Sequence, residues 1–314
     1  MCTAIVSWGA HPTLGRTLDL EYSYGESVLL TPRQFPLSFL HAAPCSSHPA
    51  ILGVGLLRKD TPLYYDAFNE HGLWAAALNF PGNAVYSAPR EGGLNLASFE
   101  VIPWLLSSCH SLREAELALS EITVTNDGFS EELPPSPLHW MVADLHGALT
   151  VEATAEGLRV YPNGIGVLTN SPPFPYQLWR LSEHRGLSAE APPCRLLSDR
   201  ELPIHTRGLG GMGLPGDFSS TSRLIRAAFA LRFTAHGGDV EAEVNRWFRM
   251  ADTVSIPDGC VLTETGEAVR TVYASCAHPL TASLYTSTYE RRSPVCHRMT
   301  EENIQGDRLG IWAL

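Results

Sequence analysis

Residues 1–19, MCTAIVSWGAHPTLGRTLD, place a cysteine directly after the initiator methionine and begin a series of short strands. TAIVSW (3–8) and RTLDLEY (16–22) have the pattern of two strands separated by a Gly-containing turn. If Met1 is removed, Cys2 carries a thiol and a free α-amine on one residue, so a nucleophile and its base are coupled without a histidine. An α-amine has a pKa of about 7.7–8.0, so a useful fraction can accept a proton near neutral pH.

Two charged residues on the second of these strands suit that chemistry. Arg16 can supply the nearby cation that lowers the pKa of a thiol. Asp19, three residues later, can accept hydrogen bonds from the amine and orient it. A structural interpretation is also available, in which Cys2 is a small core residue, Arg16 a surface charge and Asp19 a turn former. These residues alone leave both interpretations open.

Length and composition indicate a folded globular chain. Its 314 residues contain no stretch that resembles a linker, and we expect one domain over residues 1–314. No uninterrupted apolar run of about 18 residues is present, which argues against membrane insertion. The N-terminus lacks a basic region followed by a long apolar core, so we expect no export signal.

Charge and cysteine content narrow the possible partners and the compartment. The formal net charge of −11 disfavours nucleic acid and anionic membranes, because both are bound mainly through Lys and Arg. The seven cysteines show no CxxC or zinc-like spacing, which favours reduced thiols and a cytoplasmic location. The twelve histidines include no HExxH motif, so we expect neither a metal nor another cofactor.

The rest of the chain alternates between strand-like and helix-like segments. Hairpins are predicted for residues 64–80, turning at 69–72, and for 138–154, turning at 144–147. Residues 97–109 and 111–122 read as consecutive helices. Ser111 and Glu114 have capping-box spacing at the start of the second. The other predicted strands are 27–33, 50–57 and 271–289, and the other predicted helices are about 174–186, 220–236 and 239–253. Strand runs interrupted by helix pairs predict an α+β fold rather than a βαβ repeat.

Several distant segments together resemble one known family. They are MCTAI, GRTLDLEYSYGESVLLTPR, LNFPGNAVY, VLTNSPPF and GLPGDFSSTSR, in this order and over nearly the whole chain. They look like the choloylglycine hydrolase family of N-terminal-nucleophile hydrolases, which includes bile salt hydrolases and penicillin V acylases. The resemblance implies an αββα sandwich, with two stacked antiparallel sheets between helical layers.

The resemblance also implies a role for each matching residue. Cys2, exposed by removal of Met1, matches the nucleophile, with its own α-amine as general base and later general acid. Arg16 and Asp19 match the pair that polarises the thiol and orients the amine. Asn170 matches the residue whose side-chain amide donates to the oxyanion, and Asn79 matches the second oxyanion donor, through its backbone N–H. Arg223 matches the remaining active-site arginine.

Which amide is cleaved depends on the acyl pocket. In this family, bile salt hydrolases tend to carry asparagine at the position of Asn79, whereas penicillin V acylases tend to carry tyrosine. The length from Asn170 to Arg223 resembles that of tetrameric bile salt hydrolases, which implies a homotetramer. Tyr64 and Tyr65 either line an apolar acyl pocket or merely lie on a strand, and their rings suit a phenoxyacetyl group.

Three functions follow from these observations. The first is hydrolysis of glycine- or taurine-conjugated bile salts. The second is deacylation of penicillin V or another small-molecule N-acyl amide. The third is a non-catalytic small-molecule binding protein on the same scaffold, which retention of Met1 would favour.

Overall fold

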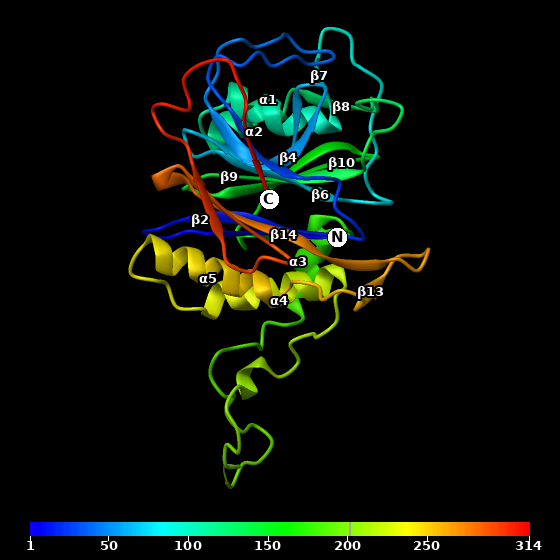
Figure 1. The fold of residues 1–314 in the computed structure, drawn as a ribbon. Coiled ribbons are helices and arrows are strands. Elements are labelled where there is room, and N and C mark those ends of the chain that lie inside the picture. The colour runs from blue at the N-terminus through cyan, green and yellow to red at the C-terminus, as the bar shows by residue number, and fades with distance from the viewer. Residues whose placement is uncertain (201) are drawn as a thin grey trace.

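Two antiparallel sheets lie face to face between two layers of helices (Figure 1). The computed structural model describes residues 1–200 and 202–314. This αββα sandwich is the predicted fold, and it is confirmed. Strands covered on both faces need apolar side chains on both, and all six residues of the first strand, Cys2–Ser7, are buried.

The first sheet carries the N-terminus. In the described residues it has seven strands in the order β12, β1, β2, β14, β15, β16, with β13 paired to the start of β14. The bounds are β1 Cys2–Ser7, β2 Thr13–Leu20, β12 Val167–Leu168, β13 Val261–Leu262, β14 Ala268–His278, β15 Ser283–Thr288 and β16 Val295–Arg298.

The second sheet faces it with eight described strands in the order β11, β10, β9, β6, β5, β4, β3, β17. The bounds are β3 Ser27–Thr31, β4 Ile51–Arg58, β5 Thr61–Asn69, β6 Trp74–Asn79, β9 Leu138–Ala143, β10 Ala148–Thr154, β11 Gly157–Pro162 and β17 Gly310–Ala313. A separate parallel pair consists of β7 Leu94–Ala97 and β8 Ile122–Thr125. Both predicted hairpins, β5–β6 and β9–β10, are present.

Five α-helices form the outer layers of the described chain. Two pack on the second sheet, namely α1 Val101–Ser108 and α2 Leu112–Leu119. The other layer contains α3 Phe174–Ser182, α4 Ser220–Phe233 and α5 Val240–Asp252, and α4 and α5 pack on the first sheet. Short 3₁₀ turns are Ser98–Glu100, Leu209–Gly211 and Pro279–Thr281. The predicted cap of α2 is present, because the Ser111 hydroxyl accepts from the backbone N–H of Glu114.

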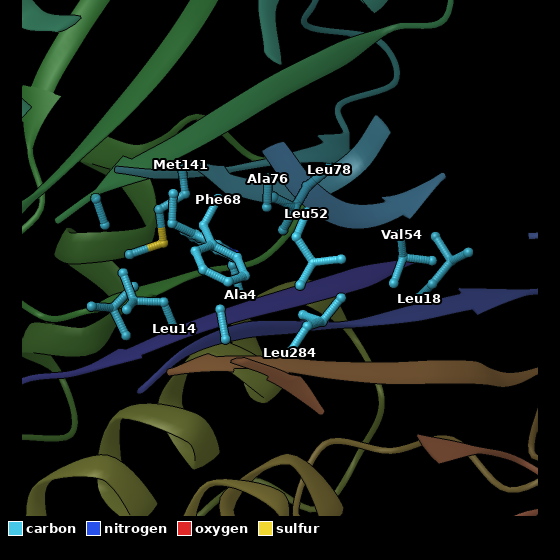
Figure 2. Close-up of a cluster of buried hydrophobic side chains, with 14 of the residues drawn as sticks. Ala4, Leu14, Leu18, Leu52, Val54, Phe68, Ala76, Leu78, Met141 and Leu284 are labelled. Atoms are coloured by element: carbon cyan, nitrogen blue, oxygen red, sulfur yellow. The ribbon is translucent and has the colours of Figure 1, made fainter. Parts of the chain in front are cut away.

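The main core lies between the two sheets (Figure 2). Leu14 and Leu18 from the first sheet meet Leu52 and Phe68 from the second. Cys2 belongs to this same buried cluster and is 3% exposed. The core therefore fixes the position of Cys2 as well as the separation of the sheets.

One long connection leaves this body. The connection between α3 and α4 extends away from the helical layer, and we call its described residues, 183–200 and 202–219, the arm (Figure 1). Four large apolar side chains of the arm are exposed, namely Leu196, Leu202, Ile204 and Met212. Among the described residues no helix has the length and apolar character needed to cross a membrane.

Candidate active site

Strand alternation places the predicted site residues of β2 on opposite faces of the first sheet. In the β1–β2 register Cys2 pairs with Leu18, and Ala4 pairs with Arg16. Side chains two residues apart share a face of a strand, so the Arg16 side chain points with those of Cys2 and Leu18 toward the second sheet. Asp19 points the other way, toward α4. The three-residue spacing of Arg16 and Asp19 therefore lets one residue face the thiol while the other faces the helical layer.

Arg16 spans the space between the sheets. The residue is 1% exposed, and its guanidinium donates to the backbone oxygen of Ala77 at 2.7 Å and to that of Tyr65 at 3.3 Å. Burial disfavours the charged form, but the neighbouring Cys2, Tyr273 and Asp66 outweigh this effect and raise the pKa of Arg16. Arg16 is therefore a fixed, buried positive charge beside the sulfur.

Asp19 is held on the other face by side-chain donors. Its carboxylate accepts from the Thr271 hydroxyl at 2.6 Å and lies 3.9 Å from Arg223. Burial raises the pKa of Asp19, with Arg223 opposing that effect. The backbone of Asp19 pairs with Met1: the Asp19 N–H donates to Met1 O at 2.8 Å, and the Met1 amine donates to Asp19 O. Met1, whose removal is predicted, thus lies beside the residue predicted to orient the new amine.

Arg223, at the first turn of α4, is the centre of the hydrogen-bond network. One terminal nitrogen, Nη1, donates to Cys2 O at 2.5 Å and to the hydroxyl of Thr3 at 2.6 Å. The other, Nη2, donates to Oδ1 of Asn170 at 2.7 Å. Such a rigid fork of donors requires arginine, because lysine presents a single nitrogen.

Asn170 connects Cys2 to Asn79. Its Oδ1 accepts from the backbone nitrogen of Cys2 at 2.8 Å, and its Nδ2 donates to Asn79 O at 2.7 Å. Because Cys2 and Arg223 both donate to Oδ1, the orientation of this amide is determined. An amide nitrogen carries two hydrogens, and the bond to Asn79 uses one.

The thiol of Cys2 is polarised by its surroundings. Burial raises the pKa of the thiol, but Arg16, the chain-terminal ammonium and a hydrogen bond from the Asn79 backbone more than offset this, so the pKa lies below its ordinary value. The Asn79 N–H therefore points at the sulfur. Among the described residues no group of three or more His, Cys, Asp or Glu side chains could hold a metal ion.

The two tyrosines predicted to line a pocket point in opposite directions. The Tyr65 side chain packs against the core that contains Cys2, and the backbone carbonyl of Tyr65 accepts from Arg16. Tyr64 is 4% exposed, packs on the α1 side of the second sheet, and its hydroxyl bonds to Thr31 at 2.6 Å. The structure therefore corrects the placement of Tyr64 at a pocket beside Cys2. A bulge lies between them: Gly55 pairs with Tyr64 and Val54 with Asp66, which leaves Tyr65 unpaired with β4.

Two parts of the site were not predicted. Asp66 is fully buried between the sheets, where its carboxylate accepts from the Tyr273 hydroxyl at 2.7 Å and the Ser275 hydroxyl at 2.6 Å. Burial raises the pKa of Asp66, and the charge of Arg16 opposes this rise. Gln177 and Ser220 contact Asn170 from α3 and α4. A sequence signal for Asp66 was available, since it is a carboxylate within a strand of otherwise apolar character.

The family described as linear amide C–N hydrolases, choloylglycine hydrolase family, matches residues 2–311. A bile salt hydrolase/transferase from Lactiplantibacillus plantarum is 40% identical over 290 residues, which cover 92% of this chain and 90% of that protein. A bile salt hydrolase/transferase from Clostridium perfringens is 33% identical, and the match covers 98% of this chain and 95% of that protein.

Solved structures show the same architecture. The C2A mutant of a conjugated bile acid hydrolase from Clostridium perfringens superposes with a TM-score of 0.92 at 31% identity and covers 100% of this chain and 97% of that one. A penicillin V acylase from Agrobacterium tumefaciens superposes with a TM-score of 0.78 at 17% identity, and the match covers 99% of this chain and 90% of that one. This similarity shows a shared fold.

Proposed function

The chain belongs to the choloylglycine hydrolase family of linear amide C–N hydrolases, and from this membership we propose that it cleaves the amide of glycine- or taurine-conjugated bile salts. The nucleophile is Cys2 after removal of Met1. The geometry that carries this proposal is the single nitrogen of Cys2, which is bonded to Asn170 while the sulfur on the same residue faces Arg16 and the Asn79 N–H. Cys2 thus carries both the nucleophile and the base, and the two oxyanion donors, Asn79 and Asn170, lie next to it.

Acylation starts with transfer of the thiol proton to the α-amine, which gives a thiolate and an ammonium. The thiolate attacks the acyl carbon, and the developing oxyanion accepts from the Asn79 N–H and from the second hydrogen on Asn170 Nδ2. Each such donor is worth about 10²–10³ in rate. The ammonium then protonates the leaving nitrogen as the C–N bond breaks, and glycine or taurine departs.

Deacylation uses the same groups in the reverse roles. Water attacks the thioester carbon while the α-amine accepts its proton, and the C–S bond breaks to release the bile acid. In this scheme Arg223 holds the Asn170 amide through Oδ1, and Asp19 accepts from the ammonium that replaces the Met1–Cys2 amide. Neither step requires a cofactor.

Intact mass and turnover test the nucleophile. We expect purified protein to lack Met1, and we expect Cys2→Ala to abolish hydrolysis of glycocholate while leaving the melting temperature within a few degrees of the wild type. A protein that keeps Met1 and binds glycocholate without cleaving it would instead be a non-catalytic binding protein. Hydrolysis at the wild-type rate by Cys2→Ala would refute the mechanism.

The acyl group is proposed to lie against Tyr65. This ring is half-buried against the core cluster that contains Cys2, and Tyr24, Glu26 and Arg58 lie close enough to influence the pKa of its hydroxyl, which burial raises. Tyr24 is 40% exposed and its ring lies 4.8 Å from that of Tyr22. These rings offer an apolar surface that suits a steroid, and Asn79 favours the bile salt over the alternative, penicillin V or another N-acyl amide.

A second candidate activity is acyl transfer. Both relatives described above are named bile salt hydrolase/transferase. An amine can attack the same thioester in place of water, so that its nitrogen bonds to the acyl carbon, the C–S bond breaks and the α-amine of Cys2 takes the proton. Incubation of enzyme and glycocholate with excess free taurine tests this directly, since transfer forms taurocholate and hydrolysis alone forms none.

Three further proposals concern the whole chain. Residues 1–314 act as one catalytic domain, because Arg16 and Asn79 come from different sheets of one sandwich. The protein is a homotetramer, a proposal that the exposed apolar side chains of the arm support. It works in the cytoplasm, which suits the free thiols of Cys2, Cys45, Cys109, Cys260, Cys276 and Cys296.

A further inference from the structure

Asn170 is held by two residues that the family resemblance does not identify, Gln177 and Ser220. Gln177 on α3 is fully buried, and its Nε2 donates to Asn170 O at 2.5 Å and to Pro172 O at 2.7 Å. Ser220, the first residue of α4, accepts from the Asn170 backbone N–H at 2.9 Å. Both backbone polar groups of Asn170 are therefore bonded to side chains rather than to a neighbouring strand.

The hydroxyl of Thr169 joins these two side chains into one chain of hydrogen bonds. It donates to Oε1 of Gln177 at 3.1 Å and lies 2.9 Å from the hydroxyl of Ser220. Since the Thr169 hydrogen goes to Gln177, Ser220 donates to Thr169. Both hydrogens of the buried Gln177 amide are thus donated and its oxygen accepts from Thr169, which fixes the orientation of the amide. His139 adds a bond from Nε2 to Thr169 O at 2.7 Å.

We propose that Gln177 and Ser220 are positioning residues that hold Asn170 in the geometry required for catalysis. This inference rests on the proposed function of Asn170. Asn170 must keep Oδ1 on the nitrogen of Cys2 and Nδ2 toward the oxyanion, and a displacement of about 1 Å can cost about 10²-fold in rate. The buried amide of Gln177 supplies that rigidity through its hydrogen bonds to the Thr169–Pro172 segment.

Replacement of Gln177 by methionine keeps its approximate size and removes its hydrogen bonds. We expect Gln177→Met to lower kcat for glycocholate by about 10- to 100-fold with KM within about 3-fold of the wild type. Asn170 Oδ1 stabilises the protonated α-amine, so a loosened Asn170 lowers the pKa of the amine. The acid limb of the kcat/KM profile then moves to lower pH, which a loss of stability alone does not cause.

Asn69 provides a matched control. It is also a fully buried amide, at the end of β5, with Nδ2 bonded to Leu106 O and Cys109 O in the other helical layer. Asn69→Leu should lower the melting temperature and leave kcat and the pH profile unchanged below that temperature. Equal losses of kcat in Asn69→Leu and Gln177→Met, or a Gln177→Met kcat within 2-fold of the wild type, would overturn the inference.

Ser220 gives a second test if Gln177→Met does not fold. Ser220→Ala should lower kcat by about 3- to 10-fold, and Ser220→Thr, which keeps the hydroxyl, should restore it. Equal kcat for the two variants would contradict the role of Ser220. Asn170→Ala in the same assay separates the two proposals. If Asn170→Ala keeps wild-type activity, the proposed role of Asn170 fails, whereas loss in Asn170→Ala beside a normal Gln177→Met refutes this inference alone.

Discussion

At the scale of the residue, the site depends on the balance of charge around the sulfur of Cys2. Burial alone would protonate and inactivate the thiol, since a desolvated thiolate is costly. Arg16 reverses this effect because its own charge is buried and bonded to the Tyr65 and Ala77 carbonyls, where it cannot move away. The result is a thiol pKa below its ordinary value.

Alkylation of Cys2 measures that pKa. A lowered pKa means that thiolate persists at lower pH, so the iodoacetamide rate of enzyme lacking Met1 should reach its half-maximum at a lower pH than the rate of an ordinary exposed cysteine. Arg16→Gln should raise the pH of this half-maximum, because it removes the neighbouring positive charge that lowers the pKa. Arg159→Gln, an exposed arginine on β11, is the control and should leave it unchanged. An unchanged pH of half-maximum in Arg16→Gln would contradict the proposed polarisation.

Arg223 is the second test at this scale. Lysine keeps the charge but can reach only part of the set formed by Cys2 O, Thr3 and Asn170. We expect Arg223→Lys to lower kcat by at least about 10-fold, as measured by release of glycine from glycocholate. Activity equal to the wild type would show that charge alone, and not the fork of donors, is needed there.

At the scale of the element, local sequence rules predicted the features that depend on nearby residues and missed those that depend on strand pairing. The hairpin turn at Asn69–Gly72 and the cap of α2 at Ser111 depend on nearby residues, so the sequence contains the necessary information. The bulge at Tyr65 depends on how β5 pairs with β4, and no local pattern indicated it. The placement of the Tyr64 and Tyr65 rings on opposite sides of the sheet follows instead from strand alternation, which lets only one of two adjacent residues face Cys2.

The site residues divide in the same way. The resemblance to a known family identified Cys2, Arg16, Asp19, Asn170 and Arg223, and the structure brings these residues together. Gln177 could not be identified, because a single glutamine in a helix with exposed neighbours looks like any solvated residue. Only the fold reveals that it is buried against the Asn170 backbone.

The α2 cap gives a prediction that separates stability from catalysis. Ser111→Ala removes the acceptor for the Glu114 N–H and should lower the free energy of unfolding by about 1 kcal/mol. Because α2 packs on the face of the second sheet that points away from Cys2, kcat should not change. Urea unfolding and glycocholate turnover measured on one preparation test both statements, and a fall in kcat would show coupling between the two layers.

At the scale of the whole molecule, the arm is the part that the sandwich does not need for its own core. Leu196 is 92% exposed and Met212 is 75% exposed. Exposure of such apolar side chains to water is unfavourable, and contact with another copy of the chain would bury them. Light scattering after size exclusion should give four chains of 34.3 kDa for the wild type. The double variant Leu196→Asp with Met212→Asp should have a smaller mass. Leu117→Asp replaces an exposed side chain of α2, far from the arm in sequence. This variant is the control and should remain tetrameric. An unchanged mass in the double variant would exclude the arm from assembly.

The central claim concerns the substrate, and side-by-side kcat/KM values for glycocholate, taurocholate and penicillin V on freshly reduced enzyme test it most directly. We predict a clear preference for the two bile salts, by at least about 10-fold over penicillin V, with no turnover of any of the three by Cys2→Ala. Preference for penicillin V, or equally weak turnover of all three, would contradict the assignment and point to a different N-acyl amide.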